Sequence, residues 1–548
     1  MIGSRIGAAH ATTCAAFLLL FVTASPRAAA AALGPYPPPA SCGARGALAD
    51  SACALLGDEA RRASWGILAV SLDRGDTLLA LAPARRLVPG SNLKLFTTGA
   101  FLRRVGPDAR RRTLLFAHGS LDGGRAGGDR FKGDLVLRGS GMPDVVQLLR
   151  PGSRGLLDSL AELLRASGLR RFEGTLWVDG TLFARAGYPH GWPLEDLALG
   201  YGAPVNPILA NGNAATIIAT GAPGGVAITT DPPDAPIQVL GTVSLGDRGT
   251  PAYLSVTREP FSPAVRVSGS VPPGGVVKRS VALFDPDSTD GHLLLGAMRR
   301  AGIAVKAVVR VWSREASGAP ALPPHEETET HPAATAEAPR ATWGAVGERA
   351  TVEILALPSP PAREVIQAVD AWSLNIETEA LLRLLDPARE GKAPERAMRA
   401  LREILAGAGV DGDDISLVDG SGLSPQNLVT ARAVVTWLVS LDRDSTLGGP
   451  FEDLLATPGS AGTLEQRLLR AAPDSTIHAK TGTLTNVSAL SGYLRTRAGE
   501  RIAFSILSNG NPGSVASAHG VEDALVSLLL RAPARPLAAA RRVVGIPR

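Results

Sequence analysis

The chain has 548 residues, of which 45% are hydrophobic and 20% charged, so it is long enough for two or three domains and has the composition of a globular protein. Its formal net charge is only +5, and because this charge is small and scattered it does not indicate a nucleic-acid partner.

The N-terminus has the pattern of a secretory signal over residues 1–32. Arg5 precedes the apolar stretch "CAAFLLLFVTA" at 14–24, and the small residues of "SPRAAAAA" follow it. The apolar core is too short to span a bilayer, although an N-terminal membrane anchor is the alternative. No later stretch is long and apolar enough to span, so we expect no membrane span in the mature protein. A cleaved signal of this kind predicts export across the membrane.

Cleavage of this signal would leave two cysteines, Cys42 and Cys53. In an exported protein they are expected to form one disulfide, and two buried thiols are the alternative.

Periodicity predicts the elements in chain order. Residues 64–83 form a hairpin around an Asp-Arg-Gly-Asp turn, and helices are expected near 154–167, 290–302, 363–384, 394–408 and 430–442. Three further strands at 475–484, 487–497 and 500–510 form a meander, followed by a helix at 520–531.

The middle of the chain, 113–349, differs from both ends. It contains many short β-rich pieces separated by Gly and Pro, which indicates a β-rich insertion of two small domains inside an α/β domain. Segment 313–341 is rich in Pro, Ala, Glu and Thr and is predicted to be a disordered loop. The enclosing domain then consists of 41–112 and 350–531, with a flexible tail at 532–548.

The use of lysine points to chemistry. Only six of the 56 basic residues are lysines, and a lysine differs from an arginine in that its amine can be tuned to accept a proton. In "SNLK", Ser91 would lie in the first turn of a helix with Lys94 on the same face, where a neutral amine could take the hydroxyl proton. The alternative is a purely structural one, in which Ser91 caps the helix and the Lys94 amine is solvated.

Two further short motifs carry hydroxyl and amine groups. "SLN" places Ser373 and Asn375 at the start of a helical pattern, where Ser373 could instead be a simple N-cap. "KTGT" places Lys480, Thr481, Gly482 and Thr483 on a strand that could hold a carboxylate, or be an ordinary edge strand.

Taken together and in this order, Ser-x-x-Lys, Ser-x-Asn and Lys-Thr-Gly form the signature of the serine penicillin-recognising enzymes. The long insertion between Ser91 and Ser373 resembles the D-Ala-D-Ala carboxypeptidase/endopeptidase family of class C low-molecular-mass penicillin-binding proteins. Further resemblance lies in "GDLVLRGSG" (133–141), "YGAPVNPILANGN" (201–213), "VDGSGLSPQNLVT" (418–430) and "GTLEQR" (462–467).

The resemblance implies a β-lactamase/transpeptidase-like α/β (α+β) domain with a five-stranded antiparallel sheet flanked by helices. It implies hydrolysis of peptidoglycan stem peptides through an acyl-enzyme that β-lactams inhibit, with no cofactor and no metal. A β-lactamase, or a non-catalytic penicillin-binding scaffold, is the alternative.

The resemblance also implies roles for individual residues. Ser91 would be acylated, Lys94 would be the base, Ser373 would pass a proton to the leaving amine, and Asn375 would hold the substrate amide. Lys480 would support the field around Ser373, while the "KTGT" residues Thr481 and Thr483 would bind the terminal carboxylate. Backbone amides of Ser91 and Thr483 would form the oxyanion hole.

Segment 188–204 resembles the family stretch that reads the substrate's side chain. Within it, Asp196 is expected to pair with a free ammonium, such as that of diaminopimelate, beside the aromatic faces of Trp192 and Tyr201. The alternative is a loop in which the two aromatic residues anchor a small core. Two departures from the family pattern, Leu374 and "SGMPD" (140–144), remove no catalytic group.

Overall fold

The computed structural model describes residues 47–122, 129–184, 187–259, 262–325, 339–388, 391–447, 449–469, 477–511 and 514–533. The predicted signal at 1–32, Cys42 and nearly all of the predicted tail lie outside these residues. Cys53 is disulfide-bonded, and its partner also lies outside them. None of the described helices is long and apolar enough to cross a membrane.

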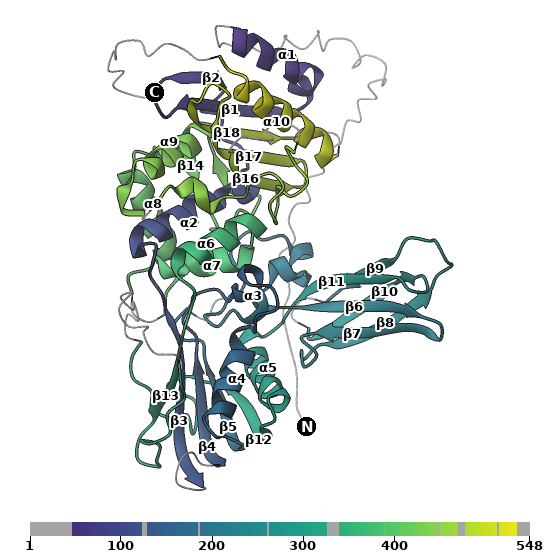
Figure 1. Cartoon of the computed structure of the whole chain (residues 1–548), viewed down its shortest axis with the longest axis vertical. Coiled ribbons are helices and arrows are strands. Elements are labelled where there is room, and N and C mark those ends of the chain that lie inside the picture. Colours follow the sequence, from purple (N-terminus) through teal and green to yellow (C-terminus); the bar gives the residue numbers. More distant parts are fainter. Residues whose placement is uncertain are drawn as a thin grey trace, which may run out of the picture. The chain divides into compact units, whose positions relative to one another are not determined.

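The first domain is built on a five-stranded antiparallel sheet in the order β16-β17-β18-β1-β2, which confirms the predicted sheet. Its strands are β1 (Ser64–Ser71), β2 (Thr77–Leu81), β16 (Ile477–Leu484), β17 (Val487–Arg495) and β18 (Arg501–Asn509). Because β1 pairs antiparallel with β18, a strand from the N-terminal part of the chain and one from the C-terminal part lie side by side in one sheet (Figure 1).

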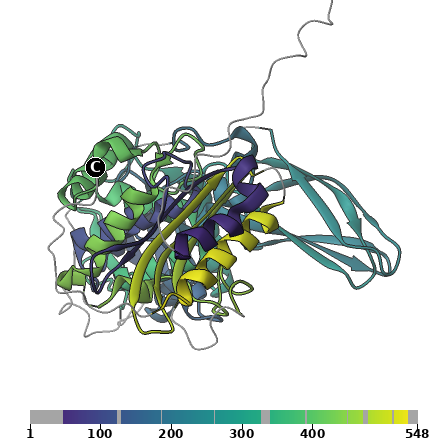
Figure 2. The ribbon, with the colours of Figure 1, turned by 90° about the horizontal axis from the view of Figure 1, so that it is seen from above.

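Helices cover both faces of this sheet. On one face lie α1 (Ala47–Arg62) and α10 (Val515–Leu530), side by side in Figure 2. On the other face lie α2 (Lys94–Val105), α6 (Ala362–Trp372), α7 (Asn375–Leu384), α8 (Pro394–Gly407) and α9 (Ala431–Asp442). Strand β18 therefore buries Phe504 and Ile506 against the first pair and Ala503 and Leu507 against the second group, which explains why both faces of this strand carry apolar residues.

A second five-stranded sheet follows within the insertion, in the order β12-β5-β4-β3-β13. Its strands are β3 (Arg112–Asp122), β4 (Arg130–Arg138), β5 (Arg171–Asp179), β12 (Ala304–Val311) and β13 (Val352–Pro358). Helices α4 (Leu156–Ala166) and α5 (Pro286–Arg300) cover one face, and the short α3 (Val146–Leu149) precedes them. Because β13 pairs with β3, the insertion's sheet extends beyond the boundary at 349 that the sequence suggested.

The insertion also contains two three-stranded sheets, which enclose a separate small core. One sheet is β11-β6-β7, with β6 (Ala214–Ala222), β7 (Gly225–Asp231) and β11 (Val276–Ala282). The other is β8-β10-β9, with β8 (Gln238–Leu245), β9 (Tyr253–Thr257) and β10 (Ala264–Val271). A final two-residue pairing joins β14 (Ile415–Ser416) to β15 (Leu428–Val429).

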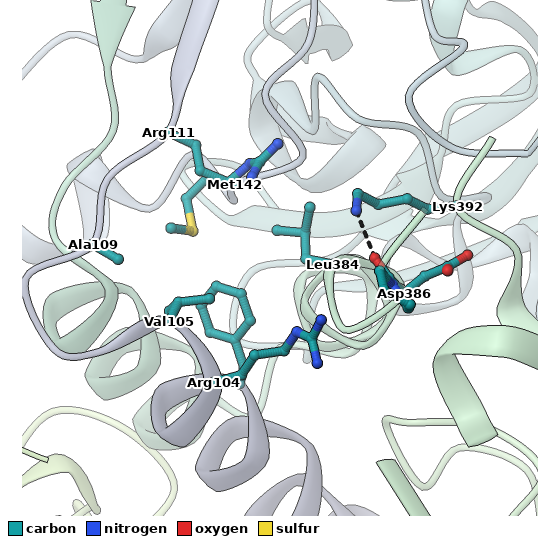
Figure 3. A pocket seen from close by; sticks show the side chains of 10 residues that line it. Arg104, Val105, Ala109, Arg111, Met142, Leu384, Asp386 and Lys392 are labelled. Carbon is teal, nitrogen blue, oxygen red and sulfur yellow. Dashed lines mark hydrogen bonds between the residues drawn. The ribbon is translucent and has the colours of Figure 1, made fainter. Parts of the chain in front are cut away.

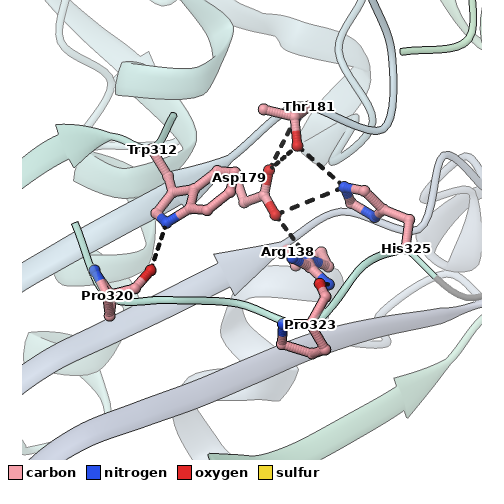
Figure 4. A network of polar contacts seen from close by, with 7 residues as sticks. All are labelled: Arg138, Asp179, Thr181, Trp312, Pro320, Pro323 and His325. Atoms are coloured by element: carbon pink, nitrogen blue, oxygen red, sulfur yellow. Dashed lines mark hydrogen bonds and ion pairs between the residues drawn. The ribbon is translucent and has the colours of Figure 1, made fainter. Parts of the chain in front are cut away.

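The prediction of disorder over 313–341 is wrong for its first part, 313–325, while 326–338 lies outside the described residues. Trp312 donates its indole N–H to the Pro320 carbonyl at 3.0 Å, and Arg138 donates to the Pro323 carbonyl at 2.8 Å. Figure 4 shows how His325 ends this segment beside Thr181 and Asp179. Composition did not reveal this order, because the contacts that hold the segment are made to backbone carbonyls. Such contacts leave no pattern in the sequence.

Candidate active site

Ser91 lies in a 3-10 turn, η1 (Gly90–Leu93), which continues directly into α2 at Lys94. Gly90 has a φ of +51°, in the left-handed region that favours glycine, and this conformation turns the chain into the helix. The three-residue spacing puts both side chains on one face, and Lys94 Nζ lies 2.9 Å from Ser91 Oγ. Hydroxyl and amine are therefore within proton-transfer distance.

The Lys94 amine has three neighbours at hydrogen-bond distance. Besides Ser91 Oγ, it donates to Asn375 Oδ1 at 2.6 Å and to the Ser421 carbonyl at 2.7 Å. The last two oxygens can only accept, whereas the serine hydroxyl can also donate. A neutral Lys94 must therefore spend both its N–H bonds on Asn375 and Ser421, which leaves its lone pair directed at the proton of Ser91.

Burial makes the neutral form of Lys94 accessible. Its side chain is fully buried, and this desolvation lowers its pKa to about 8, against the opposing fields of Asp419, Asp370 and nearby glutamates. An amine with such a pKa can exchange its proton near neutral pH, which an ordinary surface lysine cannot.

Ser373 and Asn375 come from a break between two helices, because the predicted single helix at 363–384 is in fact α6 and α7. Ser373 ends α6 with a φ of +60°, and Leu374, not Ser373, is the N-cap of α7. The N-cap alternative for Ser373 is therefore wrong. This left-handed conformation is strained for a serine, and strain of this kind is typical of functional sites. Asn375 then bridges Lys94 and the Tyr201 carbonyl, to which its Nδ2 donates at 3.1 Å.

The strand β16 brings the second lysine to the site. Lys480 Nζ donates to Ser373 Oγ at 2.8 Å and to the Thr481 carbonyl at 3.0 Å. Its side chain is also fully buried, and desolvation together with the charge of Lys94 lowers its pKa to about 7. The positive charge of Lys94 therefore disfavours a proton on Lys480.

The outer edge of β16 lies against the turn of Ser91. Asn92 Nδ2 donates to the Lys480 carbonyl at 2.9 Å, and a Cβ at Gly90 would lie 3.1 Å from the Thr483 nitrogen. The Ala479 amide donates to Ala456 away from the sheet, so by strand alternation the Thr483 amide points off the same edge. The amide of Ser91, at the start of a helix, has no intrahelical acceptor. Two amides at this edge can thus stabilise an oxyanion.

The hydroxyls of the "KTGT" strand differ in exposure. Thr481 is buried, whereas Thr483 is exposed at the open side of the strand. Gly482 between them is buried against the Ser91 turn, so the strand presents hydroxyls and amides beside Ser91 without a side chain in between.

Segment 187–204 approaches the site from the insertion, but its residues do not act together as predicted. Tyr201 donates its hydroxyl to Asp196 Oδ1 at 2.7 Å, and both side chains remain accessible, while its carbonyl contacts Asn375. Trp192 is instead buried, and its indole N–H donates to Asp419 at 2.9 Å. The indole face is therefore part of the core and not a surface for an ammonium group, which corrects the prediction for Trp192.

The sequence assigned no role to the loop at 418–430, although this loop supplies the Ser421 carbonyl to Lys94. Glu379 accepts the amides of Gly420 and Ser421, each at 2.8 Å, and Asp419 accepts those of Gly422 and Ser424. The clustered Gly and Ser of "DGSGLS" indicate a tight loop, but nothing in them tells which carbonyl reaches the lysine.

A cavity at the opposite end of α2 is not this site. It is lined by Val105, Met142, Leu384 and Lys392, among others (Figure 3), and holds only about 30 Å³, room for roughly one water molecule. Within the described ranges, no group of three or more His, Cys, Asp or Glu side chains is arranged to hold a metal ion.

Comparisons with known proteins agree with this geometry. The family model described as "D-Ala-D-Ala carboxypeptidase 3 (S13) family" matches residues 48–326 and 344–531. The D-alanyl-D-alanine carboxypeptidase of Actinomadura sp. (strain R39) is 30% identical over 535 residues, covering 91% of this chain and 89% of the relative. The D-alanyl-D-alanine carboxypeptidase DacB of Haemophilus influenzae is 22% identical, covering 81% of this chain and 85% of its own.

A solved structure shares the fold. Penicillin-binding protein 4 of Haemophilus influenzae superposes with a TM-score of 0.66 at 21% identity, over 87% of this chain and 99% of that one. With the serine–lysine pair, the strained serine and the edge strand already in place, the family match over most of the chain leads to one conclusion: the chain belongs to the D-Ala-D-Ala carboxypeptidase 3 (S13) family.

Proposed function

We propose that this member of the family cleaves peptidoglycan stem peptides ending in D-Ala-D-Ala through an acyl-enzyme on Ser91. The observation that carries the proposal is the set of partners around Lys94, because two obligate acceptors leave the amine's lone pair facing the Ser91 hydroxyl. The relatives named as D-alanyl-D-alanine carboxypeptidases support this substrate class.

In the proposed acylation, Lys94 takes the proton of Ser91 as Oγ attacks the carbonyl of the penultimate D-Ala. The negative charge that develops on the carbonyl oxygen is stabilised by the amides of Ser91 and Thr483. The peptide C–N bond then breaks, and the proton that Lys94 took passes through Ser373, whose Oγ lies 2.8 Å from Lys480 Nζ, to the leaving amine, so that Lys94 is neutral again. Water, deprotonated by Lys94, later hydrolyses the ester and restores Ser91.

The proposed substrate contacts lie along the outer edge of β16 and around Asn375. The terminal carboxylate lies near Lys480, Thr481 and Thr483, and its charge raises the pKa of Lys480 so that this lysine stays protonated in the complex. Asn375 orients the substrate amide. We infer that Asp196, held by the Tyr201 hydroxyl, pairs with an ammonium group on the substrate's side chain.

A β-lactam carries an acyl group and a carboxylate in an arrangement like that of the D-Ala-D-Ala end of the substrate. It is therefore expected to acylate Ser91, and the resulting acyl-enzyme is expected to be hydrolysed slowly. One solved structure of the Haemophilus influenzae protein is complexed with a β-lactam, which supports this expectation. The substrate lies outside the inner membrane, so the proposed location is the periplasm or the cell wall. The same chemistry permits cleavage of cross-links as an endopeptidase.

The test is Ser91→Ala on the full chain, because loss of one hydroxyl in this turn costs about 1 kcal/mol at most. We expect a penicillin adduct by intact mass on the native protein and none on the variant, together with D-Ala release from a D-Ala-D-Ala peptide by the native protein alone. An adduct on the Ala variant, or rapid turnover of penicillin without D-Ala release, contradicts the proposal.

A further inference from the structure

The segment that leads to the nucleophile crosses one face of the first sheet. Leu87 and Leu507 belong to the core on the side of helix α2, and a Cβ at Gly66 of β1 would lie only 3.1 Å from Leu87 Cδ1. Asn509, the last residue of the middle strand β18, faces the same side as Leu507 because side chains alternate along a strand. A polar side chain of the middle strand is therefore directed toward this segment.

Asn509 binds both backbone groups of Val88. Its Oδ1 accepts the Val88 amide at 2.7 Å, and its Nδ2 donates to the Val88 carbonyl at 3.0 Å. Nδ2 also donates to the Ser508 carbonyl at 2.8 Å, so both N–H bonds of the carboxamide are used. Two opposite hydrogen bonds to one residue are what a neighbouring antiparallel strand would supply. The side chain thus pairs with Val88 in place of a strand.

The backbone of β18 is not free to make this contact. At Asn509 the strand pairs with Ser64 of β1 on one side and with Val487 of β17 on the other. A contact from this strand to a segment that crosses its face must therefore come from a side chain. A carboxamide suits the task, because it carries a donor and an acceptor side by side and is neutral. The proline that follows Val88 favours extended backbone at Val88, in which its amide and carbonyl point the same way.

Two further contacts hold the segment on its other sides. The amide of Leu87 donates to the Val429 carbonyl at 2.8 Å, and the Val429 amide donates back to the Leu87 carbonyl at the same distance. Beyond the nucleophile, Asn92 Nδ2 donates to the Lys480 carbonyl at 2.9 Å. The turn η1 is therefore held by the 418–430 loop and by β16, and Asn509 is the residue that links the segment before this turn to the middle strand of the sheet.

We propose that Asn509 is a positioning residue for acylation, which fixes Val88 and thereby sets where Ser91 Oγ lies relative to the amides at the edge of β16. This inference rests on the proposed function, since it takes Ser91 as the nucleophile. Val88 is followed directly by Pro89, whose ring restricts φ, so a shift of Val88 is passed on to the turn. A displacement of about 1 Å at a reacting group can lower a rate by about 100-fold. Asn509 acts through the backbone of Val88.

The test is the time course of acylation by a fluorescent penicillin, measured on the full chain over a range of penicillin concentrations for the native protein and Asn509→Ala. Saturation separates the rate constant of acylation from the dissociation constant of the non-covalent complex. We expect the rate constant to fall roughly 10–100-fold, because the nucleophile is no longer held in place. The dissociation constant should stay the same, because the groups on β16 that bind the carboxylate are unchanged. Circular dichroism checks that the variant is folded.

The matched control is Asn511→Ala, which alters another asparagine just beyond β18. Asn511 is buried, and its Nδ2 donates to Ser508 Oγ at 2.8 Å and to the Asn486 carbonyl at 3.4 Å, neither of which belongs to the segment before Ser91. Its acylation rate constant should match that of the native protein. An equal loss in both variants would show a general structural effect and overturn the inference.

A second variant covers the case in which Asn509→Ala does not fold. Asn509→Leu keeps the volume of the side chain but removes its hydrogen bonds to Val88, so the same fall in the acylation rate constant is expected. A native rate constant in a folded variant, or a change confined to the dissociation constant, overturns the inference.

Failure of the proposed function has a different outcome. If the native protein forms no adduct that Ser91→Ala abolishes, the assignment of the nucleophile is wrong. If it does form one and the Asn509 variants acylate at the native rate, only the role of Asn509 is wrong.

Discussion

Gly482 packs so tightly against the turn before Ser91 that a Cβ on it would lie 2.4 Å from the Pro89 carbonyl oxygen and 3.1 Å from the Asn92 nitrogen. Both contacts are to backbone, which cannot swing aside as a flexible side chain can. The glycine thus sets how closely β16, with Lys480 and the Thr483 amide, approaches the nucleophile turn.

Gly482→Ala is therefore expected to push the strand away from Ser91 and to reduce penicillin acylation by at least about 100-fold, since loss of one oxyanion donor alone has that effect. Gly520→Ala is the control, because nothing lies within 4 Å of a Cβ at this position of α10 and alanine is the better helix former. Acylation of Gly482→Ala at the native rate would show that the strand position does not matter.

The acylation rate of the native protein is expected to depend on pH through Lys94. The amine must be neutral to act as a base, and its pKa is lowered to about 8, so the rate should rise tenfold per unit below this pH and level off above it. Stopped-time labelling with fluorescent penicillin between pH 5.5 and 9 measures this limb, and circular dichroism at each pH checks folding. A rate that stays constant from pH 6 to 9 contradicts Lys94 as the base.

Lys94→Arg keeps a positive charge but supplies a group that does not deprotonate. We expect acylation to fall by roughly 10²–10⁴-fold, the usual contribution of a general base. Lys278→Arg, at an exposed position on β11, serves as the matched control and should be neutral. A Lys94→Arg variant that acylates normally would mean that this lysine serves only packing.

Asp196→Asn removes a charge but retains an oxygen for the Tyr201 hydroxyl. If Asp196 recognises an ammonium, the preference for a peptide with a free side-chain amine over the acetylated peptide should drop about tenfold or more, while penicillin acylation stays unchanged. The comparison is kcat/KM for the two peptides. Glu195→Gln, the exposed neighbour in the same segment, controls for a general effect of charge. An unchanged preference in Asp196→Asn rules out this role.

The stability of the insertion is expected to depend on Asp179. It is fully buried, accepts Arg138 Nε at 2.7 Å and the Thr181 hydroxyl at 2.6 Å, and lies beside His325 (Figure 4). Asp179→Ala leaves the Arg138 charge buried without its partner. This should lower the free energy of unfolding, measured with urea, by roughly 3–5 kcal/mol.

The control for this change is Asp122→Ala, at the exposed pair with Lys132, where the loss should be about 1 kcal/mol or less. Equal losses in the two variants would mean that the buried cluster around Asp179 contributes no more than a surface ion pair.

The sequence by itself determined the elements of the first domain and the presence of three separate motifs. Alternating and 3.6-residue periodicity reflect one-sided burial, which is why the hairpin at 64–83, the three C-terminal strands and most helices were predictable. The serine–lysine pair could also be inferred, since a spacing of three within one helical turn is a local relation between Ser91 and Lys94.

Only the tertiary structure decided what surrounds these groups. The Ser421 carbonyl reaches Lys94 and the Tyr201 carbonyl reaches Asn375 only through chain folding, and backbone oxygens have no residue-type signal. The pairing of β13 with β3 and the ordering of 313–325 by proline carbonyls were missed for the same reason. The burial of Trp192 was missed because its partner, Asp419, is far away in the sequence. The local sequence determines which chemical groups a segment carries. Burial and long-range hydrogen bonds determine the protonation state of those groups in the assembled site.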